Sequence, residues 1–503
     1  MQRALELRSA KRSRQRQHLR DLGLVSGYLA LAIVLGAAVT QGIIFPAMIV
    51  AVLAVIIIWK LSEPQAVIIL ILGVIFIDRS PIVIHQSYVR LYQIFSIPIV
   101  ARWMGLRLVQ GEKIRFPKGA IWAGLWVASF VMAYPILVSR TEFFVEFLGM
   151  AYLLFLQIVV CDVIIRYDCW SSSLWAITIS GLIVVVSGLL QYPLLITHIL
   201  HTVTYGGFVR PFGLMREPDW YGVASGITML LVIHHRKRFR SAWYKMFVFG
   251  CLFGVLASLA RASWLSLGIS LIVLAAMTGP DQQVARNYIK YGLWAVLGMG
   301  VLLTAIDLHL VVEVIARFSP VSIGVANQSH VLALEAWDSR LASIRLMMFL
   351  IHLHPWIGNG AGIMGKLSNL PSIQSIFAYG GQLNTGRATT NVILAQLASV
   401  GIIGTVPFVI WLGNALVYGL KKSQGSPIIG VILILCLVDF QFNSGTGYGF
   451  FWIFMGMAGV RMSPSMSRVL VPSPSPLPLR EDHLSLSHSY PELIAESRQI
   501  LGK

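Results

Sequence analysis

Four stretches of the chain place charged or polar side chains beside apolar runs, where a charge is costly and is therefore a candidate for function. The first, VRPFGLMREPDWYG at 209–222, contains two arginines and two acids: Arg210, Arg216, Glu217 and Asp219. Its arginines could bind an anion, because guanidinium donors form a rigid fork that matches phosphate. The alternative is an interfacial loop in which Asp219 caps the next helix.

The second stretch, SLARASWLSL, contains Arg261 between two apolar spans that are joined with almost no loop. This arginine either extends to the phosphate of a lipid or binds an anionic group of a substrate. We favour the second interpretation, because the guanidinium geometry suits phosphate.

The third stretch is RLASIRLMMFLIHLHPWIGNGAG, with Arg340, Arg345, His352 and His354. The two arginines are five residues apart and so lie on adjacent helical faces. A His-x-His pair without nearby Asp, Glu or Cys is weak evidence for a metal, so none is expected. The histidines are therefore either structural or take part in acid–base chemistry or phosphate contact.

The fourth stretch, GRATTNVILAQLASVGIIGTVPF, has a polar start that leads into a helix and contains Arg387, Thr389, Thr390 and Asn391. Thr390 or Asn391 could simply be the N-cap. Together, the four stretches indicate a site that neutralises an anion. The sequence shows no Walker loop and no nucleotide fingerprint, and a lipid-linked diphosphate would need neither.

The composition predicts the elements that position these residues. The chain is 56% hydrophobic and 12% charged, whereas soluble domains are about one-quarter charged. Apolar runs of about 20 residues can span a bilayer, and lipid requires them to be helical. We therefore expect an all-α integral membrane protein, a bundle of about 12 to 14 transmembrane helices. The expected spans are 24–40, 43–59, 64–77, 91–108, 119–138, 143–165, 173–196, 219–234, 243–260, 262–278, 288–306, 391–419, 427–440 and 448–460.

The positive-inside rule orients these spans. With a basic N-terminus in the cytoplasm, the later clusters of lysine and arginine also fall there, and both termini are cytoplasmic. The exported segments are then 78–90, 197–218, the turn at Arg261 and a long loop. This distribution accounts for the net charge of +18 without nucleic acid. No small-residue cleavage site follows the first apolar run, so that helix is expected to stay in the inner (plasma) membrane.

Five regions follow from this topology. They are a basic cytoplasmic N-terminus (1–22), a first transmembrane part (23–306), a large extracytoplasmic loop (307–388), a last transmembrane part (389–461) and a disordered cytoplasmic tail (462–503). Within the large loop, one set of apolar residues has helical spacing and predicts an amphipathic helix on the membrane or on the bundle: Trp337, Ile344, Leu346, Met347, Phe349 and Leu350. The HPWIGNGAGIMGK segment then predicts turns.

In this order, the four stretches resemble the O-antigen ligase and O-antigen polymerase superfamily of membrane glycosyltransferases. The first is similar to the family's Arg-x-x-Gly-x-x-x-x-Pro segment, and SLARASWLSL to its arginine turn. HPWIGNGAGIM is similar to its His-Pro-x-x-Gly-x-Gly segment. Asn391, nine further residues and GIIGT follow its His-Asn or His-Ser pattern, with Thr390 in place of the histidine. The resemblance covers about residues 170–460.

The resemblance implies a metal-independent transferase without a cofactor, acting in cell-surface polysaccharide biosynthesis such as that of lipopolysaccharide. Its donor would be a glycan linked to polyprenyl (undecaprenyl) diphosphate, and its acceptor a lipid- or sugar-linked hydroxyl; ligase and polymerase are not separated. The implied roles are catalysis by His354, His352 or Thr390, diphosphate binding by Arg210, Arg216, Arg261 and Arg345, and support from Glu217, Arg340, Arg387 and Asn391.

Threonine cannot act as a base at neutral pH, which leaves three alternatives. His352 or His354 substitutes for the family histidine, that histidine is dispensable, or this chain has lost transfer activity. Two other functions compete with transfer: an anion transporter of the bicarbonate type and a non-catalytic scaffold of a polysaccharide assembly system.

Overall fold

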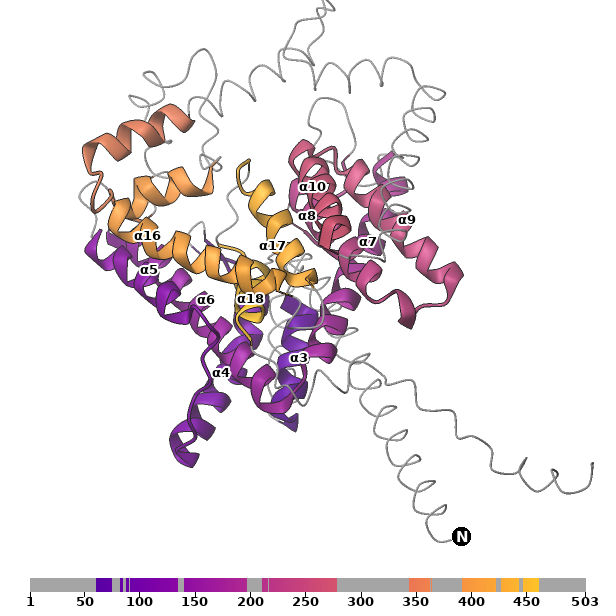
Figure 1. Cartoon of the computed structure of the whole chain (residues 1–503), viewed down its shortest axis with the longest axis horizontal. Helices are drawn as coiled ribbons and strands as arrows, with labels where there is room; N and C mark the ends of the chain where they lie inside the picture. Colours follow the sequence, from indigo (N-terminus) through magenta and orange to yellow (C-terminus); the bar gives the residue numbers. More distant parts are fainter. Residues whose placement is uncertain are drawn as a thin grey trace, which may run out of the picture. The chain divides into compact units, whose positions relative to one another are not determined.

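Helices dominate the described part of the chain (Figure 1). The computed structural model describes residues 60–74, 82–84, 87–89, 91–133, 140–196, 210–215, 217–277, 343–361, 363, 391–421, 427–442 and 447–460. All of these belong to one compact unit, formed by 1–422 and 426–461; the second unit, 423–425 and 462–503, lies outside them. The predicted tail, the N-terminus and the spans 24–40, 43–59 and 288–306 also lie outside the described residues.

The remaining predicted spans each contain a helix. These are α3 (Glu63–Val74), α4 (Leu91–Gln110), α5 (Ala120–Met132), α6 (Arg140–Tyr167), α7 (Trp170–Ile196), α8 (Pro218–His234), α9 (Ser241–Ala257), α10 (Arg261–Met277), α16 (Val392–Leu420), α17 (Ile428–Asp439) and α18 (Gly449–Ala458). Within the described residues, three segments are long and apolar enough to cross a membrane: Phe143–Tyr167, Trp170–Gln191 and Val392–Leu420. An eleven-residue helix in the predicted loop, Ser343–Leu353, is called the loop helix below.

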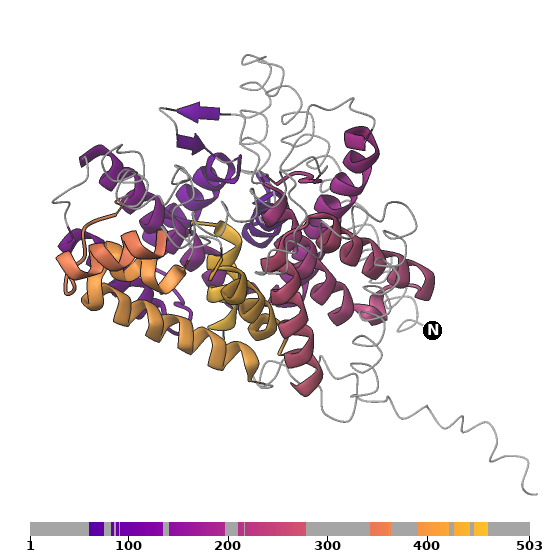
Figure 2. The same cartoon turned by 90° about the horizontal axis from the view of Figure 1, so that it is seen from above.

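One small β-hairpin interrupts the helical pattern in the predicted connection 78–90. Strands β1 (Ile82–Ile84) and β2 (Ser87–Val89) pair antiparallel, with Val83 opposite Tyr88 (Figure 2). The β-branched side chains of β1 favour an extended backbone. The prediction of an all-helical chain therefore omitted this hairpin.

The helices run in alternating directions, so that their ends form two distinct groups. One group, called the site end because the candidate site described below lies there, contains the starts of α8, α10, α16 and α18 and the ends of α9 and α17. The opposite group, called the basic end, contains the ends of α8 and α16 and the starts of α9 and α17. Backbone contacts join these termini; for example, Val392 at the start of α16 donates to the carbonyl of Phe440 beyond α17 at 3.2 Å. At the basic end, Lys118 donates through its backbone to Gly459 after α18 at 3.0 Å.

Aromatic side chains fill the core between α5, α16 and α18. Trp126 stacks on Trp411 and on Trp452, with ring centres 5.5 Å and 5.4 Å apart, and also packs on Phe408. Its indole nitrogen donates to Gln396 Oε1 at 2.9 Å, so the polar atom of this buried ring has a partner. Figure 1 shows α5 running beside α16, as this packing requires.

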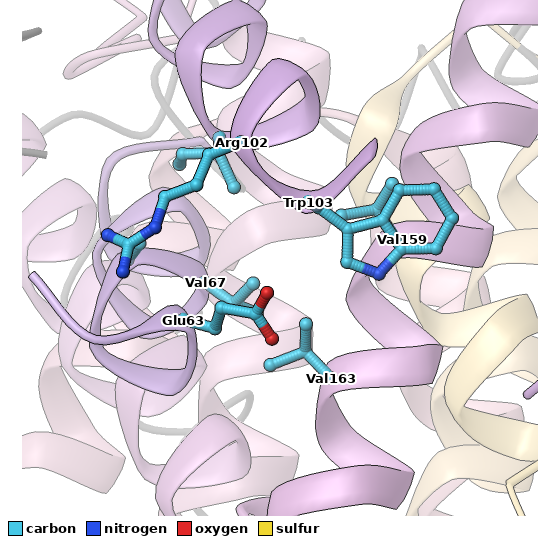
Figure 3. Close-up of a pocket in the computed structure, with 8 residues that line it drawn as sticks. Glu63, Val67, Arg102, Trp103, Val159 and Val163 are labelled. Carbon is cyan, nitrogen blue, oxygen red and sulfur yellow. The ribbon is translucent and has the colours of Figure 1, made fainter. Parts of the chain in front are cut away.

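A buried charge network joins α3, α4 and α6 at the basic end. Arg107 contacts Glu63 at 2.9 Å and Asp162 at 3.0 Å, and Trp103 Nε1 donates to Asp162 at 2.8 Å. A cavity of about 10 Å³ adjoins Glu63 and Trp103 (Figure 3). This volume holds at most one water molecule, so the cavity is too small to bind a substrate.

Candidate functional site

Arg210 is fixed where α8 begins. Its Nε donates to the carbonyl oxygen of Ser258 at 2.6 Å, and its Nη2 donates to Asp219 Oδ1. The side chain is only 13% exposed. Within the described residues, Nη1 has no hydrogen-bond partner, so one edge of the guanidinium is positioned by the protein and the other can bind an anion.

One interpretation of the sequence made Asp219 the N-cap of α8, but the structure places another residue there. The N-cap is Glu217, whose side chain makes no capping hydrogen bond, and Pro218 occupies the first helical turn. Proline is preferred there because its fixed φ suits the helix and the first turn needs no donor. Asp219 therefore lies inside that turn and pairs with Arg210 instead. Arg216 lies outside the described residues.

The predicted tight turn at Arg261 is confirmed. α9 ends at Ala257 and Arg261 is already the first residue of α10. Leu259 turns the chain with a φ of 51°, and Ser258 Oγ accepts from the backbone of Ala260 at 3.2 Å. Arg261 is exposed and two residues from Ser263, which contacts α8. The first and second stretches therefore meet at the site end.

Asp439 is a site-end residue that the sequence argument missed. It is the last residue of α17 and fully buried. Ser263 Oγ lies 3.3 Å from Asp439 Oδ1 and 3.2 Å from the carbonyl oxygen of Asp219, so one hydroxyl joins α8, α10 and α17. An acid at the end of the apolar span 427–440 was the signal, because buried carboxylates require partners.

Asn391 caps α16, as one of the two interpretations predicted. Its Oδ1 accepts from the backbone of Ile393 at 3.1 Å and of Leu394 at 3.0 Å. Its Nδ2 donates to Gln441 Oε1 at 2.9 Å, which ties the start of α16 to the residues after α17. Asn391 therefore orders the site end. Thr390 and Arg387 lie outside the described residues.

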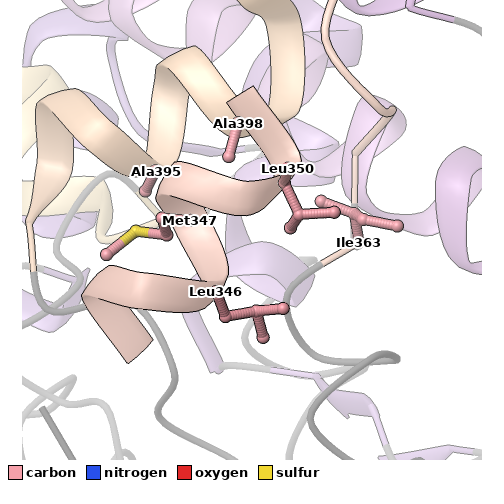
Figure 4. Packing of buried hydrophobic residues seen from close by; sticks show 6 residues of the cluster. All are labelled: Leu346, Met347, Leu350, Ile363, Ala395 and Ala398. Atoms are coloured by element: carbon pink, nitrogen blue, oxygen red, sulfur yellow. The ribbon is translucent and has the colours of Figure 1, made fainter. Parts of the chain in front are cut away.

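The loop helix packs on α16, which confirms the predicted amphipathic helix and places it on other helices. Its buried face is Leu346, Met347 and Leu350, against Ala395 and Ala398 (Figure 4). The small alanines let the two helices approach closely.

One residue predicted to lie on the apolar face of the loop helix is exposed instead. Phe349 is 44% exposed and so does not belong to the buried face. Arg345 is also exposed. Arg340 and Trp337 lie outside the described residues.

The turn after the loop helix docks into a break in α16, and this contact joins the third and fourth stretches. Gly401 interrupts α16 with φ 61° and ψ −169°. Across the break, Asn359 donates to the carbonyl of Ala398 at 3.0 Å, and Ile402 donates to that of Pro355 at 2.9 Å. A side chain on Gly401 would collide with the backbone of Trp356. Gly401 of the GIIGT motif and Gly358 of the HPWIGNG motif, where a side chain would meet the backbone of Ser399, therefore serve this docking.

The two candidate histidines lie at the end of the loop helix, just before the turn that docks at this break. His352 is exposed, with Nδ1 2.7 Å from the carbonyl of Met348, and His354 is partly buried. The Pro355 contact is with Ile402, eleven residues along α16 from Asn391, or about 16 Å at 1.5 Å per residue. The described contacts therefore do not bring the histidines to Arg210. Within the described residues, no cluster of three His, Cys, Asp or Glu could hold a metal.

No protein-family model matches this chain, and no curated protein matches it. The resemblance to the O-antigen ligase and polymerase superfamily thus rests on the four stretches and their order.

Proposed function

We propose that the chain is a multi-pass protein of the inner (plasma) membrane that transfers or polymerises a polyprenyl-diphosphate-linked glycan onto a sugar acceptor at the outer face. The observation that carries the proposal is the arrangement of Arg210 at the site end. Two acceptors of the protein hold its guanidinium, Nη1 is left for a ligand, and Arg261 begins the neighbouring helix.

The alternation of helix ends supports the membrane topology. Arg115, Arg166, Arg238 and Lys421 belong to the basic end, and the positive-inside rule assigns that end to the cytoplasm. The site end would then face outward, where a lipid-linked donor is presented after export. Both termini would be cytoplasmic, and 307–388 would be the large extracytoplasmic loop.

In the proposed reaction, an acceptor hydroxyl attacks the anomeric carbon of the donor glycan. A new glycosidic bond forms while the bond to the polyprenyl diphosphate breaks, and negative charge grows on the leaving phosphate. Arg210 and Arg261 would stabilise that charge, because fixed donors act most strongly where charge develops. The hydroxyl proton would pass to solvent, because the described contacts do not bring His352 or His354 to Arg210.

The test is glycan transfer by purified protein in liposomes that contain a polyprenyl-diphosphate-linked donor, measured beside bicarbonate uptake in the same vesicles. We expect transfer by the wild type, its loss in Arg261→Ala with normal insertion, and its retention in Lys113→Ala, which removes an exposed cation from the basic end. Uptake without transfer would identify a transporter, and neither activity would indicate a scaffold; either result overturns the proposal.

A further inference from the structure

The connection between α8 and α9 concentrates positive charge at the basic end. Residues 234–240 read HHRKRFR, and no aspartate or glutamate occurs from 220 to 280. Three of these basic residues form a short 3-10 turn, η1 (Arg236–Arg238), and are exposed; Arg240 follows and is exposed too. Within the described residues, no ion pair neutralises Arg236, Lys237 or Arg238, so this turn presents a positive potential that attracts anions.

Aromatic rings hold two of these arginines in place. Arg238 Nη2 donates to Ser171 Oγ at 2.6 Å, and its guanidinium carbon lies 5.4 Å from the ring centre of Trp175. The guanidinium carbon of Arg236 lies 5.8 Å from the ring centre of Tyr244. These contacts order the turn. Within the described residues, Lys237 and Arg240 make no ion pair, so both charges are available to a ligand.

An exposed apolar surface continues directly from this turn along the first half of α9. Trp243 is 52% exposed, Met246 48% and Phe249 63%. Exposed apolar side chains beside a basic turn match a ligand with an anionic head and an apolar tail. Tryptophan and basic residues are also the pair that marks the interface between a membrane and water.

We propose that the α8–α9 turn binds the head group of an anionic phospholipid in the cytoplasmic leaflet. The phosphodiester would contact Lys237 and Arg240, and an acyl chain would lie along Trp243 and Phe249. Because the ligand is a lipid, its tail contributes to affinity together with the charge. The inference rests on the membrane topology proposed above and is independent of glycan transfer.

The experiment uses the full chain in an uncharged detergent, with binding measured by native mass spectrometry. The probes are short-chain phosphatidylglycerol, short-chain phosphatidylcholine and glycerol phosphate. We expect the wild type to prefer phosphatidylglycerol to phosphatidylcholine at least about fivefold, since each basic residue near an anionic lipid adds attraction. Glycerol phosphate, which lacks the tail, should not displace it at equal concentration.

Two variants locate the site. Lys237→Gln with Arg240→Gln should lower phosphatidylglycerol affinity at least about fivefold. Lys113→Gln with Lys421→Gln removes the same charge at the same end and should change it less than about twofold. Trp243→Ala should weaken the lipid without changing the weak binding of glycerol phosphate. Equal loss in both double variants, equal binding of the two lipids or displacement by glycerol phosphate would each overturn the proposal.

Discussion

Arg210 and Asp219 form an ion pair that uses only part of the arginine. The carboxylate holds Nη2 and the carbonyl of Ser258 holds Nε, which fixes the plane of the guanidinium. An ion pair that consumed the whole fork would have no further chemical use. This ion pair fixes the orientation of the guanidinium and leaves its Nη1 edge available to a ligand.

Arg210→Lys tests whether this positioning of the guanidinium matters for transfer. Lysine keeps the charge but is a point donor that cannot bind Ser258, Asp219 and a phosphate in one plane. We expect the rate of glycan transfer to fall by about 10²-fold or more. The free energy of unfolding should change by no more than about 1 kcal/mol, since the pair is partly exposed.

The measurement is initial transfer rate in liposomes together with thermal unfolding in detergent. Arg240→Lys, at the basic end, is the matched control and should leave both unchanged. Wild-type rates in Arg210→Lys would show that Arg210 is a structural residue only.

Gly401→Ala should disrupt the docking of the turn after the loop helix against α16. At φ 61° and ψ −169°, the backbone is in a region that is open essentially to glycine, which alone costs about 1–3 kcal/mol for another residue. The added carbon would also collide with the backbone at Trp356 and Gly358. We expect loss of protection of 354–360 in hydrogen exchange and a lower unfolding temperature.

Gly413→Ala lies in the same helix, and a side chain there meets nothing within 4 Å. Alanine favours a helix over glycine by about 1 kcal/mol, so this control should be neutral or stabilising. Equal behaviour of the two variants would remove the role assigned to the break.

The sequence predicted the helices well and the site only in part, for physical reasons. Apolar periodicity and the cost of exposed backbone in lipid locate each helix whatever its neighbours are, so α8 to α10 follow the expected spans closely. Asn391 as a cap was also predictable, because capping is local. In contrast, the partnership of Asp219 with Arg210, and of Asp439 with Ser263 176 residues earlier, depends on which helix ends meet. Hydrophobicity does not specify that choice.

The loop helix illustrates the same limit on one element. Its spacing predicted a buried apolar face, and Leu346, Met347 and Leu350 form it. Which side of the loop helix faces α16 depends on the positions of Ala395 and Ala398, and Phe349 lies outside that side and stays exposed. The HPWIGNG and GIIGT motifs lie in different stretches of the sequence, and the hydrogen bonds across Gly401 bring them together.

Arg107→Ala should destabilise the basic end strongly. It leaves Glu63 and Asp162, both buried, without their shared cation. Removing one partner of a buried ion pair costs about 3–5 kcal/mol, whereas Lys113→Ala, at an exposed position, should cost less than about 0.5 kcal/mol. Unfolding in denaturant measures both.

A neutral version of the network distinguishes lost charge balance from lost packing. Arg107→Met combined with Glu63→Gln and Asp162→Asn keeps similar volumes, removes the three buried charges and leaves Arg166 paired with Glu112, so it should recover most of the stability. If the triple variant is as unstable as Arg107→Ala, the hydrogen bonds of Asp162 to Trp103 and to the backbone of Arg115 matter more than the ion pairs.

His235, just after α8, should make the protein less stable as the pH falls. Burial, with the neighbouring charges of His234 and Arg238, lowers the pKa of His235 from 6.5 to about 3. In the unfolded chain its pKa is near 6.5, so between about pH 6.5 and 3 the unfolded state binds a proton that the folded state does not.

The free energy of unfolding is therefore unaffected by His235 above pH 6.5 and falls below it, by up to about 1.4 kcal/mol per pH unit. His235→Gln should flatten the dependence of the unfolding temperature on pH between pH 7 and pH 5 relative to the wild type. An unchanged slope in His235→Gln would mean that other groups set the acid sensitivity of the basic end.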